Sequence, residues 1–231
     1  MAISKTTMQS DSRPNVCRAV RAVGILKPKF NPAKATFDPP TIDVLGTGFW
    51  LKQEGLFVTC GHVISNLLSG PIDFTGMLVV GGNGFSYCRA SIDVYDLMHD
   101  LAVLSMHLPV DQLKQQIDTG LAIATTNATV SDRVSYAGFP FGNILLNNRH
   151  SPTYAEGIVG NEVLNEQLPK QVQISGQVAH GFSGSPIVKV SAPTDVIGVV
   201  ANSPTEAIGQ ANIFRGIGWP HLKAICDLAN S

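Results

Sequence analysis

The sequence has little charge and few of the features that mark a nucleic-acid-binding, membrane-spanning or disordered protein. Charged residues make up 14% of the 231 residues, the formal net charge is −1, and the sixteen lysines and arginines are scattered. No basic stripe therefore indicates a nucleic-acid partner. No apolar run approaches the roughly eighteen residues that a membrane-spanning helix needs, so we expect no membrane partner either. Hydrophobic residues reach 44%, which is typical of a globular chain that buries a core.

A secretion signal and a zinc-binding cysteine pattern are also missing. The N-terminal stretch MAISKTTMQSDSRPNV is polar and lacks the apolar core of a signal peptide, so we expect a cytoplasmic location. The four cysteines (Cys17, Cys60, Cys88 and Cys226) are widely spaced and form no C-x-x-C pair, which argues against a metal site. Their number allows two disulfides, but free buried thiols are the favoured interpretation for a cytoplasmic chain.

Short runs of β-branched and aromatic residues, separated by Gly, Asn and Pro, fill the chain from residue 41 onward. Examples are GLFVTC, LAVLSM and SPIVKV. This spacing predicts an all-β fold, either an antiparallel barrel or a sandwich. We expect a Pro- and Lys-rich N-terminal arm over residues 1–40, two β units over 41–110 and 121–218, and a polar connector over 111–120. A short helix is expected over 219–231, because Leu222, Ile225 and Leu228 make one apolar face.

Three dispersed side chains have the types that nucleophilic catalysis needs. Ser183 lies between Gly181 and Gly184 in a sharp bend, where glycine permits backbone dihedrals that other residues resist. A serine hydroxyl needs a general base, and the base needs an acceptor that orients it. His62, at the exit of an apolar run, and Asp100, immediately before another, could fill these roles. Alone, each has a structural explanation: a hydrogen-bonded histidine, a strand-end turn and a surface turn.

Other candidates near these positions are less favoured. Asp93 and Asp96 alternate on a half-exposed strand, so we expect them to face solvent. Cys60 is two residues from His62, but we expect the two side chains to diverge, which argues against a cysteine nucleophile. The N–H groups of Gly181 and Ser183 could converge on one point and stabilise an oxyanion.

The order His, Asp, Ser and the local motifs resemble the trypsin-like serine protease superfamily. VTCGHV is similar to its histidine motif, HDLAVL to its aspartate motif and GFSGSP to its serine motif. The high-temperature-requirement (HtrA or Deg-like) branch is the most similar, because GTGFWL, YAGFPFG, AEGIVG and FRGIGWP resemble further landmarks of that branch. The similarity covers roughly residues 41–231.

The resemblance implies a chymotrypsin-like fold of two packed six-stranded antiparallel β-barrels with a short C-terminal helix. It also implies a serine endopeptidase that forms an acyl-enzyme, needs no cofactor, and acts on a protein or peptide substrate. His62 would be the general base, Asp100 its orienting group and Ser183 the nucleophile, with Gly181 and Ser183 forming the oxyanion hole. We expect no peptide-binding PDZ domain, so the trimeric assembly of the HtrA branch is in doubt.

Two positions depart from the family pattern. Phe182 stands where digestive relatives carry an aspartate that pairs with a new N-terminus, so activation by N-terminal trimming is not expected. Ser185 replaces the usual second glycine of the serine motif, and we expect so small a residue to be tolerated.

The resemblance also predicts the pocket for the substrate side chain. Its floor and wall hold no carboxylate that could receive Lys or Arg, so cleavage after small or medium uncharged residues is expected. The predicted pocket residues are Gln177, Val178, Ala179, His180, Ala201, Asn202 and Ser203. His180 is more simply read as a surface residue. Two other functions remain open: an inactive protease-like domain that binds peptides or a partner, and a latent protease that a regulatory protein partner switches on.

Overall fold

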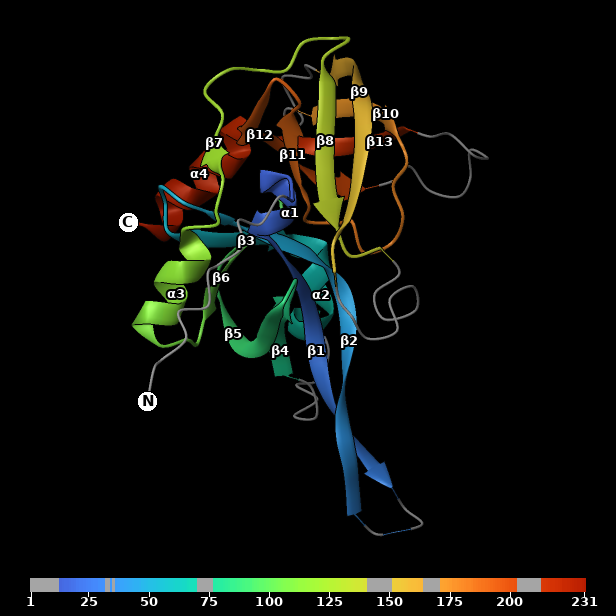
Figure 1. Ribbon diagram of the computed structural model, residues 1–231, viewed down its shortest axis with the longest axis vertical. Helices are drawn as coiled ribbons and strands as arrows, with labels where there is room; N and C mark the ends of the chain where they lie inside the picture. The colour runs from blue at the N-terminus through green and yellow to red at the C-terminus, as the bar shows by residue number, and fades with distance from the viewer. Residues whose placement is uncertain are drawn as a thin grey trace, which may run out of the picture.

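The first barrel is a closed antiparallel sheet of six strands in the order β1-β2-β3-β6-β5-β4 (Figure 1). The computed structural model describes residues 13–31, 34, 36–69, 77–140, 151–163, 171–202 and 213–231. The strands of this barrel are β1 (Val20–Asn31), β2 (Thr36–Leu51), β3 (Leu56–Cys60), β4 (Met77–Gly82), β5 (Phe85–Asp96) and β6 (Leu101–Met106). Strands β3 and β6 read as continuous apolar runs because nearly all of their side chains are buried.

The second barrel is closed by pairing of β11 with β12, and a two-residue strand, β7, is added to β12 in parallel. Its strands are β7 (Ala122–Ile123), β8 (Arg133–Gly138), β9 (Thr153–Val163), β10 (Gln171–Gly176), β11 (Pro186–Lys189), β12 (Ala192–Asn202) and β13 (Ile213–Gly218). Its core packs Tyr136 edge-to-face against Phe182 and Phe214, with ring centroids 5.5 and 5.0 Å apart. The predicted architecture of two six-stranded barrels is confirmed.

Across the residues that the structure describes, four helices accompany the barrels: α1 (Asn15–Ala19), α2 (Gly61–Ser69), α3 (Val110–Ile117) and α4 (Trp219–Ala229). Helix α1 lies between the barrels in Figure 1 and buries Val16, Cys17 and Ala19. Helix α4 matches the expected C-terminal helix and buries Leu222 and Ile225, although Leu228 is 61% exposed. None of the helices in the described ranges has the length and apolar character needed to cross a membrane.

The expected N-terminal arm over residues 1–40 is wrong for much of that range. Residues Val20–Asn31 form β1, which pairs with β2 along its length and with β4 from Ala22 to Leu26. Beyond Leu26 the β1–β2 pair continues with no third strand among the described residues, and it projects from the barrel as a two-stranded ribbon (Figure 1). Part of the expected connector over 111–120 is helical, because α3 covers Val110–Ile117.

The four cysteines are free, as expected. Three of them are buried, and Cys88 is half-buried.

Candidate active site

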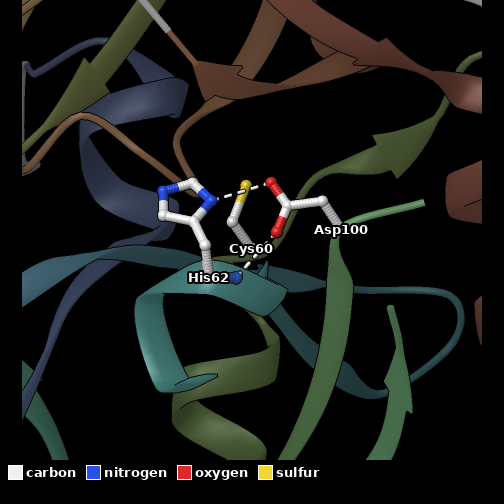
Figure 2. Close-up of side chains that lie close together, drawn as sticks. All are labelled: Cys60, His62 and Asp100. Atoms are coloured by element: carbon white, nitrogen blue, oxygen red, sulfur yellow. Dashed lines mark hydrogen bonds and ion pairs between the residues drawn. The ribbon is translucent and has the colours of Figure 1, made fainter. Parts of the chain in front are cut away.

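His62 is placed by the end of β3 and the first turn of α2. The Gly61 N–H donates to the Asp100 carbonyl at 2.9 Å, and a side chain at Gly61 would lie within 3.2 Å of the Asp100 carboxylate. Asp100 binds His62 twice: Oδ1 accepts from the His62 backbone N–H and Oδ2 contacts ring Nδ1, both at 2.7 Å (Figure 2). The carboxylate therefore fixes both the backbone and the ring of the histidine, and it leaves Nε2 on the other side of the ring.

Asp100 has an unusual backbone conformation for a residue with a side chain. Its φ is +54°, in the left-handed region that aspartate tolerates better than most residues. It ends the turn that precedes β6, whose first residue, Leu101, pairs with Cys60. The pairing of β3 with β6 therefore places Asp100 beside His62, as expected from the resemblance of their motifs to the protease family.

The rival carboxylates are occupied elsewhere. Asp93 is exposed, as expected, and accepts a hydrogen bond from Ser105. Asp96 is half-buried rather than solvated, and it binds His99 Nδ1 at 2.5 Å. Burial opposes ionisation of Asp96, but the hydrogen bonds from His99 outweigh it and lower the pKa of this carboxyl.

Ser183 lies in a loop whose two glycines have the backbone conformations that the sequence predicted. Gly181 has a φ of +99° and Gly184 a φ of +85°. The Phe182 N–H donates to the Ala179 carbonyl at 3.1 Å, so residues 179–182 form a turn with positive φ at its third position, as in type II. In a type I turn the peptide between the two central residues would be flipped, so that its N–H and its carbonyl would exchange sides.

The first barrel holds this loop through Thr47, in β2. The Thr47 N–H donates to the Ser183 carbonyl at 2.8 Å, and Thr47 Oγ1 donates to the Gly181 carbonyl at 2.6 Å. The same Oγ1 accepts from the Phe139 N–H at 3.0 Å. Sequence reasoning used GTGF only as a family landmark and missed this role of its threonine.

The N–H groups of Gly181 and Ser183 have no backbone acceptor within the described part of the chain. The Ser183 hydroxyl donates to the Ala201 carbonyl at 3.4 Å. Two such N–H donors, one residue apart and beside a hydroxyl, are the groups that can bind a developing oxyanion.

Residues 46–199 match the family described as the trypsin-like peptidase domain, and this range holds His62, Asp100 and Ser183. The chain belongs to the trypsin-like peptidase family.

Among solved structures, this trypsin-like peptidase domain is similar to one described as the HtrA-type protease AlgW with a decapeptide. The TM-score is 0.70 at 19% sequence identity, and the match covers 93% of this chain but 65% of the AlgW chain. At that identity the likeness shows the fold, and the chain spans about two thirds of the AlgW length. No curated protein sequence matches the chain significantly.

The predicted pocket residues of this peptidase domain are only partly described. The carbonyl of Ala179 accepts from the Phe182 N–H, and the carbonyl of Ala201 accepts from the Ser183 hydroxyl. The backbone carbonyl of Gln177 accepts a hydrogen bond from Tyr136 Oη at 2.6 Å. Val178 packs on the core of the second barrel, and His180 is exposed. The side chain of Asn202 and all of Ser203 lie outside the described residues.

The two departures from the family pattern have structural explanations. Phe182 is 4% exposed and packs on Tyr136, so it anchors the loop to the core of the second barrel. Ser185 is fully buried, and a side chain at Gly138 would come within 2.3 Å of its hydroxyl. Serine is thus accommodated because glycine stands opposite.

The side chains of Cys60 and His62 do not diverge, contrary to expectation. The Cys60 sulfur, a ring nitrogen of His62 and a carboxylate oxygen of Asp100 all lie within 4.8 Å of one another (Figure 2). The thiol is nevertheless poorly suited to be a nucleophile. Complete burial, followed by the charge of Asp100, raises the pKa of Cys60 well above its ordinary value.

Proposed function

We propose that the chain is a serine endopeptidase with His62, Asp100 and Ser183 as its catalytic triad. The observation that carries the proposal is the pair of 2.7 Å contacts from Asp100 to the ring and backbone of His62. A carboxylate at Nδ1 holds the proton on that nitrogen and leaves the Nε2 lone pair available as a base.

In the proposed reaction, His62 Nε2 takes the proton of the Ser183 hydroxyl as Oγ attacks the scissile carbonyl. The oxyanion that forms accepts hydrogen bonds from the N–H groups of Gly181 and Ser183. His62 then gives its proton to the leaving amine, and the C–N bond breaks to leave an acyl-enzyme. Water, deprotonated by the same nitrogen, releases the acid and restores the serine.

The loop conformation supports a competent site over a latent one. The positive φ of Gly181, and an N–H with no backbone acceptor among the residues that the structure describes, suit a formed oxyanion hole. In the proposed reaction the Ser183 hydroxyl must leave the Ala201 carbonyl, to which it donates at 3.4 Å, and bind His62 Nε2. Catalytic hydrogen bonds commonly form only when substrate binds.

A fluorophosphonate probe tests the proposal directly. Wild-type protein should be labelled covalently and should hydrolyse a peptide substrate, and Ser183→Ala should lose both activities. Ser185→Ala is the matched control, because it removes another hydroxyl of the same loop that is buried and has no role in the reaction. Labelling that persists in Ser183→Ala would exclude Ser183 as the nucleophile.

The substrate proposal is cleavage after small or medium uncharged side chains. It is supported by Val178 and Ala201, which are apolar and half-buried beside the loop. A peptide-library cleavage profile tests it, and a dominant preference for Lys or Arg would contradict it.

Location and regulation are part of the same proposal. Four free cysteines support a reducing compartment such as the cytoplasm. The activity of a cytoplasmic protease must be restrained, and we propose that a regulatory protein partner does this.

A further inference from the structure

A thiol, an imidazole and a carboxylate meet on the Asp100 side of His62. Cys60 Sγ lies beside the line that joins His62 Nδ1 to Asp100 Oδ2 (Figure 2). The three groups can each offer one ligand atom, and these atoms lie within 4.8 Å of one another. Thiolate, imidazole and carboxylate are the three side-chain ligands of protein-bound zinc.

The proposed reaction makes no use of the Cys60 thiol. The sulfur donates a hydrogen bond to the Val200 carbonyl at 3.1 Å, which explains its place in the fold but not its closeness to the His62–Asp100 pair. A purely structural thiol would bind no metal, and this difference makes the two roles separable by experiment.

We propose that Cys60 Sγ, His62 Nδ1 and an Asp100 carboxylate oxygen form a binding site for a thiophilic divalent cation such as Zn²⁺, and that the bound ion switches the peptidase off. The part of the proposal that concerns inhibition rests on the proposed function. The part that concerns binding does not.

The geometry requires only small movements. Ligands about 2.0–2.3 Å from a tetrahedral ion are roughly 3.3–3.6 Å from one another. The 2.7 Å contact between Nδ1 and Oδ2 must therefore open by roughly 0.6 Å, and the sulfur must close from within 4.8 Å. The His62 and Asp100 side chains are 41% and 33% exposed, so the ion can approach from solvent while the sulfur stays buried.

The ligand set selects the class of ion. A thiolate favours Zn²⁺, Co²⁺ and similar ions over Mg²⁺ and Ca²⁺, which prefer oxygen ligands. On binding, the Cys60 thiol loses its proton to solvent. The imidazole stays neutral, because it loses the Nδ1 proton and takes one up on Nε2. The divalent charge is then balanced by one thiolate and one carboxylate.

This change of tautomer gives the inhibition a physical cause. With the ion on Nδ1 and a proton on Nε2, His62 has no lone pair with which to accept the Ser183 proton. Asp100 is drawn to the ion at the same time and no longer orients the ring. A chelator should reverse both effects.

Cobalt absorption tests binding without any need for activity. Full-length Ser183→Ala protein titrated with Co²⁺ should develop the near-ultraviolet charge-transfer band of a thiolate–cobalt bond. The band should disappear in Ser183→Ala/Cys60→Ala and persist in Ser183→Ala/Cys88→Ala. Cys88 is the control because it is the most accessible of the four thiols and the one to which cobalt would most easily bind nonspecifically. Cys60→Ser serves as a second variant that can keep the hydrogen bond to Val200 if the alanine variant does not fold, which thermal melting reports.

Zinc inhibition of the otherwise wild-type protein tests the consequence. Each variant is compared with its own metal-free rate of peptide hydrolysis. The half-inhibiting Zn²⁺ concentration should rise at least about tenfold in Cys60→Ala. This is the lower end of the loss in metal affinity when a hydrogen-bonding partner of a metal ligand is removed, and removal of a ligand itself should cost no less. It should stay at the wild-type value in Cys88→Ala, and Mg²⁺ should not inhibit.

The outcomes separate the two proposals. Absence of the cobalt band, or its persistence without Cys60, overturns the site whether or not the protein is a peptidase. Equal zinc inhibition with and without Cys60 overturns the switch. A Cys60-dependent band in a protein that fluorophosphonate fails to label supports the metal site and contradicts the proposed function alone.

Discussion

Replacing Thr47 by valine tests how the first barrel restrains the loop that holds Gly181 and Ser183. Valine has nearly the shape of threonine but lacks Oγ1, which donates to the Gly181 carbonyl at 2.6 Å and accepts from the Phe139 N–H at 3.0 Å. The backbone N–H of residue 47 would still donate to the Ser183 carbonyl. The substitution therefore removes the restraint on Gly181 and leaves the one on Ser183.

The cost to stability follows from burial. Thr47 is fully buried, so its replacement leaves one carbonyl and one N–H without partners. Each unsatisfied buried group costs about 1–3 kcal/mol. With partial relaxation, we expect the free energy of unfolding to fall by about 2–4 kcal/mol. Thr47→Ser keeps the oxygen and loses one methyl group, at a cost of about 1 kcal/mol.

The cost to catalysis follows from the position of Gly181. Its carbonyl and the Phe182 N–H belong to one peptide, which Thr47 and Ala179 hold from its two ends. If the carbonyl is released, the adjacent Gly181 N–H loses its fixed direction. Loss of one oxyanion donor lowers kcat by about 10²–10³, so partial misalignment in Thr47→Val should lower kcat by about 10- to 10³-fold, with a smaller effect on KM.

The assay is steady-state hydrolysis of a peptide substrate, with urea unfolding measured on the same samples. Thr47→Ser should keep kcat within a few-fold of wild type. A Thr47→Val protein that keeps its kcat while its stability falls would show that Oγ1 is purely structural. Equal losses of kcat in Thr47→Ser and Thr47→Val would show that the methyl group, and not Oγ1, is responsible.

Three further changes test other features of the fold. Gly184→Ala should unfold at a lower temperature. Its free energy of unfolding should fall by more than the ~1–2 kcal/mol that a left-handed backbone costs a residue with a side chain, since the added methyl would lie 1.9 Å from the Thr47 carbonyl oxygen. Phe182→Ala should lower the free energy of unfolding by about 3–5 kcal/mol, whereas Phe182→Leu, which refills most of the space, should cost less; equal losses in urea unfolding would contradict the packing argument. Asp132→Asn tests the acid limb of stability. A hydrogen bond from the Thr129 N–H, followed by an ion pair with a lysine, lowers the pKa of Asp132. Its contribution is therefore complete above the unfolded pKa of about 3.9 and is lost as the pH falls through the lower folded value. The stability difference between wild type and Asp132→Asn should accordingly shrink below about pH 4, and a difference that grows there would show the sign to be wrong.

The barrel strands could be predicted where burial is the dominant constraint. The segments Leu56–Cys60 and Leu101–Met106 are almost wholly buried, so their apolar runs identify them. The first strand was missed although Val20, Ala22 and Val23 are buried. Its outer half carries Lys27, Pro28 and Lys29 and, of the strands that the structure describes, pairs with β2 alone. This polar half concealed the apolar beginning of the strand.

The chemical types at the site could be predicted, but the groups that hold them could not. A histidine, an aspartate and a serine between glycines are recognisable in sequence because catalysis demands those side chains. Thr47 and Cys60 instead bind main-chain carbonyls 134 and 140 residues away along the chain. Any residue has a carbonyl, so no sequence pattern marks the partner, and only the packing of the two barrels brings the groups together.

The same contacts make the relative position of the barrels part of the proposed chemistry. The Val200 carbonyl accepts from the Gly184 N–H of the serine loop and from the Cys60 sulfur of the first barrel. Thr47 spans the same boundary to Ser183. A shift between the barrels would therefore move Ser183 and His62 relative to each other.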